Sequence, residues 1–425
     1  MRQFRLACLS YVSLALPGST LGLLWPPMSR STHEPLAALG IFIVFGTAAS
    51  VLAGLATGPL LGRLGVGPVL AGGAALVATA LGAESVAPSF VVLVCGSVLF
   101  STGFGAADTA VNAYAAGHLG PRDTNWLHAS YGLGATLGPL VVTALLGQGL
   151  GWRWAMACLA GAQGALSLYL LARVAWWAAA PGAAPSRPTV TSAPASERSP
   201  GPAGTAKRRA GRGGPGWRRP GWRRPGWRRQ GWGPLAVLVA TLVFCALETG
   251  AESAAGIWGF VYLSAGEHLG PTAAGAAVSA YWATMFVGRM VMGPVAERTG
   301  AAPAMGLATA GVVGGALVVT LAGGPAPAVV GLALVGLAAA PIFPLVNTTT
   351  ARRFGAGAAV GPTRAVTLQV GASTLGGAVV PALAGLAIGG GHPGALGPVL
   401  LVTSAAMALA LALMSPPGRP ALPAG

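Results

Sequence analysis

Twelve apolar runs, each long enough to cross a bilayer, constrain this chain more than any other feature. A helix needs about 20 mostly apolar residues to span the hydrocarbon core. Charged or turn-rich breaks separate the runs 5–26, 36–58, 67–84, 89–115, 125–147, 152–177, 234–263, 272–294, 302–322, 326–350, 363–387 and 395–414. Lipid offers no hydrogen bonds, so such runs must satisfy their backbone polar groups within helices. We therefore predict an all-α integral membrane protein with twelve transmembrane helices.

The composition excludes a soluble enzyme. Only 8% of the 425 residues are charged, whereas soluble domains carry about 25%. Four isolated cysteines (Cys8, Cys95, Cys158, Cys245) form no C-x-x-C pair, and the sequence has no H-E-x-x-H or P-loop pattern. We predict neither an enzyme nor a cofactor or metal.

The basic residues predict the orientation. The net charge is +16, and with the N-terminus inside, 23 of the 25 basic residues fall on the cytoplasmic side. Only Arg30 and Arg153 fall outside. Such asymmetry follows the positive-inside rule. We expect a multi-pass protein of the cell (plasma) membrane with both termini in the cytoplasm.

A polar segment divides the chain into three parts: a six-helix bundle over 1–177, a linker over 178–232 and a second bundle over 233–425. The linker repeats Gly-Trp-Arg-Arg from Gly216, Gly221 and Gly226. Its prolines and lack of apolar periodicity predict disorder. Arginine with interleaved tryptophan is a pattern that could bind nucleic acid. In a membrane protein, the simpler interpretation is that the linker is attracted to anionic lipid. We expect no nucleic-acid partner.

The two bundles are related by an internal repeat. The stretch after the second run matches the stretch after the eighth at an offset of 235, and the same offset places Asn112 on Asn347. The matched pairs are Gly58/Gly293, Pro59/Pro294, Arg63/Arg298, Gly65/Gly300 and Pro68/Pro303. Secondary transporters use repeated halves to build alternating access around a central site.

Both copies resemble the G-x-L-x-D-R-x-G-R-K loop signature of the major facilitator superfamily. The first copy has Gly62 in place of the acid, whereas the second keeps Glu297. The motif Gly103-x-Gly105-x-x-Asp108-x-x-x-Asn112 and those around Tyr131 and Glu252 resemble the fucose-permease-like branch. The resemblance implies a twelve-helix transporter of sugar-like solutes. It also implies gating roles at the two loops for Gly58, Arg63, Gly65, Arg289, Gly293, Glu297, Arg298 and Gly300.

Three acids lie inside predicted spans: Asp108, Glu248 and Glu252. A charged residue there costs at least about 2.5 kcal/mol, so it marks a functional site by default. Asp108 and Asn112 are four residues apart and share a helix face. This pair could bind the hydroxyl groups of a solute or carry a proton. Asn112 alone could instead hydrogen-bond a neighbouring helix.

Glu248 and Glu252 are also four residues apart. Two such close carboxylates are not both ionised in a low-dielectric site, so one of them suits a proton carrier. The alternative is an ion pair with a neighbouring helix. Proton symporters of the resembled branch carry an acid in their first helix. The run 5–26 has none, so Glu252 is the candidate substitute, and facilitated diffusion stays open.

Further candidates carry two interpretations each. His128, beside Tyr131, suits a pH-responsive gate or a packed interfacial histidine. Arg289 suits snorkelling or a salt bridge with the loop. The aromatic rings suit stacking on a sugar or anchoring at the interface, and the amides suit solute binding or contacts between helices. The aromatic candidates are Trp25, Trp258 and Tyr281, and the amides are Asn347 and Gln369.

We therefore predict a monomeric alternating-access transporter of a small polar, sugar-like solute, with proton coupling through Asp108 and Glu252. One alternative is an efflux transporter for amphipathic compounds on the same fold. Another is a non-transporting membrane sensor or interaction protein that engages a partner through its basic linker.

Overall fold

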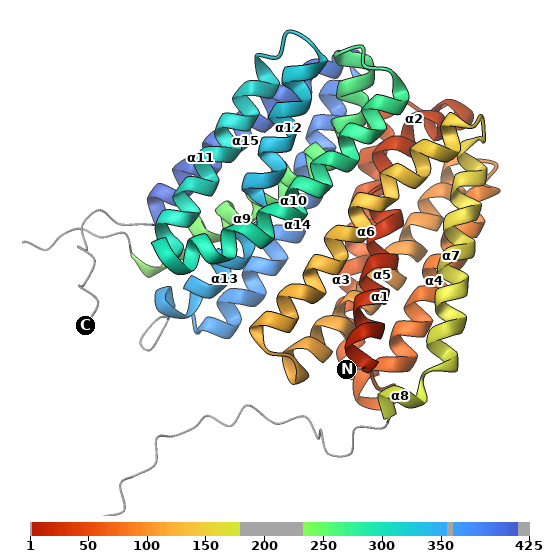
Figure 1. Ribbon diagram of the computed structural model, residues 1–425, viewed down its shortest axis with the longest axis horizontal. Coiled ribbons are helices and arrows are strands. Elements are labelled where there is room, and N and C mark those ends of the chain that lie inside the picture. The colour runs from red at the N-terminus through yellow and green to blue at the C-terminus, as the bar shows by residue number, and fades with distance from the viewer. Residues whose placement is uncertain (1, 179–232, 355–359, 415–425) are drawn as a thin grey trace, which may run out of the picture. The chain divides into compact units, whose positions relative to one another are not determined.

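A computed structural model describes residues 2–178, 233–354 and 360–414, and the described residues are almost entirely helical (Figure 1). The prediction of an all-α chain is confirmed. The predicted linker and its Gly-Trp-Arg-Arg units lie outside the described residues, apart from Ala178.

The helices of the first half follow the six predicted runs. They are α1 (Arg2–Gly18), α2 (Leu21–Thr32), η1 (Leu36–Ala38), α3 (Leu39–Leu64), α4 (Val66–Ser85), α5 (Phe90–His118), α6 (Pro121–Gly147), α7 (Trp152–Ala172) and the short α8 (Ala175–Ala178).

The second half repeats this plan. Its helices are α9 (Pro234–Val261), the π-helical η2 (Tyr262–Gly266), α10 (Pro271–Thr299), α11 (Ala301–Thr320), α12 (Pro325–Ala339), α13 (Ile342–Arg353), α14 (Pro362–Gly389), η3 (Pro393–Ala395) and α15 (Leu396–Met414).

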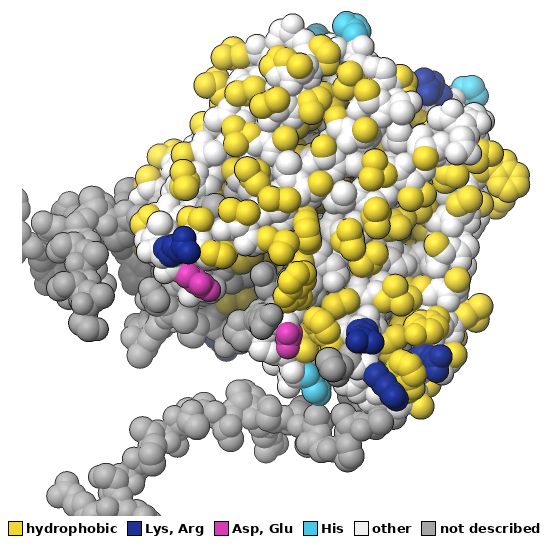
Figure 2. Space-filling model, in the orientation of Figure 1, with side chains coloured by type: hydrophobic (Ala, Val, Ile, Leu, Met, Phe, Trp, Pro, Cys, Tyr) yellow, Lys and Arg dark blue, Asp and Glu magenta, His cyan; other side chains and the backbone are white. Residues whose placement is uncertain are grey.

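Eleven helical segments of the described chain are long and apolar enough to cross a membrane. The twelfth predicted span is α10, which has 29 residues but carries Arg289, Glu297 and Arg298. Figure 2 shows hydrophobic side chains over the broad middle of one face and charged ones near the helix ends. Leu55, for example, is 74% exposed. In a soluble protein such a surface would aggregate, whereas lipid solvates it.

Two predicted spans are broken in the structure. The run 5–26 divides between Gly18 and Leu21, where the Thr20 hydroxyl donates to the Pro17 carbonyl at 2.7 Å. The run 326–350 divides at Pro341, and proline has no N–H to donate to the hydrogen bonds of a helix. Side-chain and backbone partners can satisfy the freed polar groups in membrane proteins, and hydropathy alone does not reveal such a break.

The repeated stretches are helical almost throughout, whereas the sequence placed loops after 58 and 294. α3 continues through Pro59 to Leu64, and α10 continues to Thr299. The chain then turns at one residue in each half, at Gly65 with φ of 79° and at Gly300 with φ of 89°. Glycine adopts positive φ without a steric penalty, which explains why both copies of the repeat have glycine here.

Glycines let the helices of each half approach closely. A Cβ atom at Gly134 would collide with the carbonyl of Val12, so α6 packs directly on the backbone of α1. In the second half, a Cβ atom at Gly376 would collide with the backbone of Ala246, so α14 packs in the same way on α9. Small residues at such crossings replace the hydrophobic driving force that lipid does not supply.

The backbone conformation shows a second sign of the repeat. His33 and His268 are separated by the same offset of 235, and both have φ of 57°. His33 ends α2, and its N–H donates to carbonyls of the last turn. Left-handed geometry costs a residue with a Cβ atom about 1–2 kcal/mol.

We expect His33→Gly and His268→Gly each to stabilise the protein by about 1 kcal/mol, because glycine removes this steric cost. The measurement is the thermal unfolding midpoint of the purified protein in detergent. His392→Gly is the matched control, because its φ of −116° lies in an ordinary region. A midpoint that rises equally for His392→Gly would contradict the explanation.

Candidate functional site

Asp108 on α5 is held by the first helix of the chain. The Tyr11 hydroxyl of α1 donates to its Oδ1 at 2.8 Å. One turn further along α5, the Asn112 Nδ2 donates to the Asp108 backbone carbonyl at 3.0 Å. Asp108 and Asn112 are both partly exposed. The predicted pair therefore forms a polar site that is partly accessible and already hydrogen-bonded.

Aromatic rings from α1, α5 and α6 surround this pair. The Tyr11 ring lies 5.7 Å from that of His128 and 5.8 Å from that of Tyr131, between centroids. Tyr131 also meets Phe104 edge-on at 6.4 Å. Offset and edge-on arrangements of this kind are favourable contacts between rings. The structure brings Asp108 and Asn112, which the sequence placed on one helix face, together with the candidates His128 and Tyr131, and it adds Tyr11.

Glu248 and Glu252 of α9 differ in accessibility. Glu248 is buried, and its Oε2 accepts a hydrogen bond from the Thr249 hydroxyl at 3.0 Å. Glu252 is partly exposed, and its backbone carbonyl accepts a hydrogen bond from the buried Tyr281 at 2.9 Å. A carboxylate that a solute or a proton reaches must be accessible, so Glu252 is the better placed of the two.

Arg289 of α10 connects the two halves electrostatically. Its charge acts on Glu248 and Glu252 in the second half and on His128 and Tyr131 in the first. Its guanidinium Nη2 contacts the Met285 sulfur at 3.8 Å. Arg289 is partly exposed among these groups. The sequence placed it with the gating loop, whereas the structure places its charge beside the central acids.

The two amide candidates occupy different environments. Gln369 is fully buried, and its Oε1 accepts a hydrogen bond from the Thr350 hydroxyl at 3.0 Å, which links α14 to α13. Asn347 is partly exposed, and its Oδ1 is a buried oxygen with no hydrogen-bond partner among the described residues. Gln369 therefore acts as a contact between helices in this structure, and Asn347 keeps a free acceptor.

Trp25 and Trp258 are enclosed by protein. Both are fully buried, and their indole N–H groups donate to backbone carbonyls, of Leu36 at 2.9 Å and of Pro381 at 2.8 Å. Neither ring is accessible to a solute in this structure. Tyr281 is likewise buried, against Trp282. These aromatic candidates pack the protein interior.

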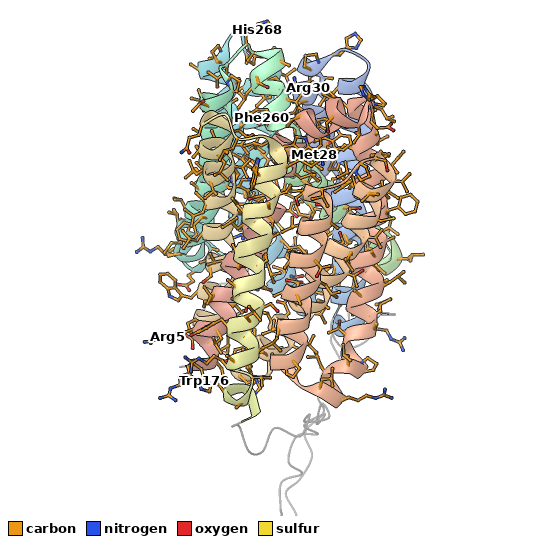
Figure 3. All side chains as sticks on the ribbon, turned by 90° about the vertical axis from the view of Figure 1, so that its right-hand side faces the viewer. Arg5, Met28, Arg30, Trp176, Phe260 and His268 are labelled. Carbon is orange, nitrogen blue, oxygen red and sulfur yellow. The ribbon has the colours of Figure 1, made fainter. Side chains whose placement is uncertain are left out.

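Helix ends define two sides of the bundle. Figure 3 shows Arg5 and Trp176 at one end, here called the N-terminal side, and Arg30 and His268 at the other, here called the far side. Three predicted gating residues, Arg63, Glu297 and Arg298, are exposed near the helix ends of the N-terminal side, unlike the partly exposed Arg289. Gly58 and Gly293 lie within α3 and α10.

The closest glycine contacts between the two halves lie at the far side. A Cβ atom at Gly22 of α2 would collide with the Ile257 carbonyl of α9, and one at Gly389 would lie 2.8 Å from the Ala37 Cβ. A Cβ atom at Gly275 of α10 would likewise collide with Thr143 of α6. The structure therefore represents a state in which the far side is closed.

Sequence reasoning missed Tyr11, which holds Asp108. A signal was present, because a phenol in the middle of an apolar run needs a hydrogen-bond partner. No group of three or more His, Cys, Asp or Glu side chains in the described part of the chain is arranged to hold a metal ion.

Two helical halves with a polar site drawn from both define a membrane transporter. The comparisons agree. The family model of the Major Facilitator Superfamily matches residues 7–381. The chain belongs to this superfamily, and it is a transporter rather than an enzyme. No curated protein matches the sequence.

Solved structures of the superfamily share the fold. A mutant of the nucleoside transporter NupG has a TM-score of 0.69 and 15% identity, covering 96% of this chain and 98% of its own. NupG itself has a TM-score of 0.65 and 14% identity, covering 97% and 99%. A bacterial homologue of the human lysosomal transporter Spinster, inward-facing and unoccupied, has a TM-score of 0.64 and 11% identity. The match covers 97% of this chain and 94% of the homologue. At such identities the likeness shows the fold alone, and the resemblance to the fucose-permease-like branch stays a prediction.

We expect Gly22→Leu to weaken the closed far side, because overpacking a close contact typically costs about 1–3 kcal/mol. Spin labels at Arg30→Cys and His268→Cys, with the exposed Cys95 and Cys158 replaced by alanine, would report the far-side distance. We expect the distribution to shift to longer distances.

Gly18→Leu is the matched control, because no atom lies within 4 Å of its Cβ position. Identical distributions for the two leucine variants would show that the Gly22 contact does not hold the far side closed.

Proposed function

We propose that this transporter carries a small polar, sugar-like solute and couples its movement to protons through Asp108 and Glu252. The observation that carries the proposal is a partly exposed polar site drawn from both halves. Asp108, Asn112 and Tyr131 come from the first half, and Glu252 and Arg289 come from the second.

The chemistry of the site suits hydroxyl groups. Carboxylates and the side-chain oxygen of Asn112 accept hydrogen bonds, while Arg289 and the tyrosine hydroxyls donate them. A solute rich in hydroxyls can satisfy both kinds of group, whereas a purely apolar one would leave them unpaired at a cost. The nucleoside transporter NupG offers a parallel, because a nucleoside contains a sugar ring.

Coupling follows from the distribution of acids over two halves that move relative to each other. A carboxylate that exchanges the Tyr11 hydrogen bond for water or solute changes its affinity for a proton. Glu252 experiences the charges of both Glu248 and Arg289. Glu252 and Arg289 also act on Tyr131 of the first half. Rearrangement of the halves would change these interactions across the interface, which is the requirement for coupling.

The alternative of an efflux transporter for amphipathic compounds has one observation in its favour. The rings of Phe100 and Phe104 stack at 6.2 Å, and Phe104 continues to Tyr131. This apolar strip adjoins the polar site. An uptake screen of monosaccharides and nucleosides, run beside an export assay with lipophilic cations, separates the two solute classes.

The membrane context completes the proposal. We place the protein in the plasma membrane as a monomer, with both termini and the basic linker in the cytoplasm. The N-terminal side carries Arg2, Arg5, Arg63, Arg173 and Arg298. This arrangement follows the positive-inside rule. The linker would then lie against anionic lipid.

We expect Asp108→Asn and Glu252→Gln each to abolish the acceleration of solute uptake by a pH gradient in proteoliposomes, a loss of roughly tenfold or more. Each substitution keeps the size of the side chain and removes its titratable proton. Uptake driven by the solute gradient alone should persist, because the hydrogen-bonding shape is retained.

Glu84→Gln is the matched control, because Glu84 is a buried acid of α4 outside the central site. Its pH-gradient dependence should match that of the unmodified protein. If both central variants also keep their full dependence on the gradient, the proposed coupling is wrong.

A further inference from the structure

Two arginines share one tryptophan ring at the N-terminal side of the first half. The guanidinium carbon of Arg173, just after α7, lies 4.5 Å from the Trp176 ring centroid, and that of Arg2 on α1 lies 5.4 Å from it. Arg173 also lies 5.5 Å from the Tyr169 ring. Cation–π contacts fix guanidinium groups in place while their N–H edges stay available.

The ring belongs to a rigid platform. Gln3 of α1 donates from Nε2 to the Trp176 carbonyl at 2.9 Å, which ties α8 to the start of the chain. The neighbouring Trp177 packs on Gly67, where a Cβ atom would lie 2.8 Å from its ring, and meets Tyr114 edge-on at 5.1 Å. Residues from α1, α4, α5 and α8 therefore hold the two tryptophans.

Among the described residues, no salt bridge with an acid neutralises the positive charge of this platform. The Nε of Arg173 and the Nε1 of Trp177 are buried donors without a hydrogen-bond partner among the described residues. The acid that acts on this region is Asp123 of α6, whose charge reaches Cys8 and Tyr114. Arg5 adds a third positive charge at the same end of the bundle as Trp176 (Figure 3). Figure 2 shows Lys and Arg side chains gathered beside hydrophobic ones at the end where α1 begins.

The far side offers a contrast. Arg153 also stacks on a tryptophan, Trp152, at 4.4 Å. Its guanidinium Nη1, however, already donates to the carbonyls of Ser85 and Ala87 at 3.2 and 2.9 Å. Arg153 therefore caps the C-terminal end of α4. The guanidinium groups of Arg2 and Arg173, in contrast, have N–H donors available for an external acceptor.

We propose that Arg2, Arg5 and Arg173, with the indole of Trp176, bind the phosphate headgroup of an anionic phospholipid. The platform lies at the ends of α1 and α7, the level at which tryptophan and arginine meet headgroups. Guanidinium groups form bidentate hydrogen bonds with phosphate oxygens. This site lies on the folded bundle and is separate from the lipid attraction expected of the linker.

The chain itself offers little to fill the site. The segments outside the described residues contain one acid, Glu197. A single carboxylate does not match three arginines, whereas phosphate carries several acceptor oxygens. The lipid is therefore the better match in charge and geometry.

Native mass spectrometry of the full-length protein in a neutral detergent tests the proposal. The probes are short-chain phosphatidylglycerol, phosphatidylcholine and inorganic phosphate. We expect the protein to retain phosphatidylglycerol, and the triple variant Arg2→Gln, Arg5→Gln, Arg173→Gln to lose roughly fivefold in affinity for each arginine removed. The linker is unchanged in this triple variant, so the difference isolates the platform.

Controls keep the test decisive. Arg30→Gln with Arg153→Gln removes two far-side charges and should leave retention unchanged. Arg2→Gln with Arg5→Gln alters only exposed side chains, so a loss of retention is expected even if the triple variant does not fold. Trp176→Leu should weaken retention without any change of charge.

Four results would overturn the proposal. The first is that the variants retain as much phosphatidylglycerol as the unmodified protein. The second is that the unmodified protein retains as much phosphatidylcholine as phosphatidylglycerol. The third is that inorganic phosphate alone occupies the site as fully as phosphatidylglycerol, which would indicate a free-anion site. The fourth is retention that appears only after Glu197→Gln, which would show that the linker acid occupies the arginines.

Discussion

The structure depends on one constraint, which is that a backbone inside lipid must satisfy its own hydrogen bonds. The constraint forces the apolar runs into helices, and it also governs where they break. At the break between α1 and α2, the Thr20 hydroxyl and carbonyl take over bonds with Pro17, Leu23 and Leu24. Broken helices of this kind occur where membrane proteins build binding sites.

Close packing of the helices follows from a second property of lipid. Lipid tails do not drive apolar surfaces together, so helices adhere through close backbone contact. Glycines supply this contact within each half, and at Gly22 and Gly275 they supply it between the halves. The glycine contacts between the halves that leave no room for a Cβ atom lie at the far side. Such an interface can open while each half moves as a body.

The central site shows which polar residues the sequence could reveal. Asp108 and Glu252 were identifiable because an acid in an apolar run is costly and stands out. Tyr11 did not stand out, because a phenol is half apolar and 97 residues separate it from Asp108 in the chain. Arg289 was visible as a charge near a helix end. Its action on His128 and on Glu252 depends on how α10 packs against α6 and α9, which no local pattern encodes.

The sequence by itself determined the helices and the repeat at an offset of 235, and it predicts that the basic residues lie on one side. These properties follow from local rules: run length against bilayer thickness, matched motifs and charge against membrane depth. The tertiary structure decided which side chains meet. It buried Trp25 and Trp258, joined Gln369 to Thr350 and placed Arg2 and Arg173 on one ring. The reason is physical: helix periodicity fixes which face a residue occupies, but only the packing of helices distant in sequence fixes what that face touches.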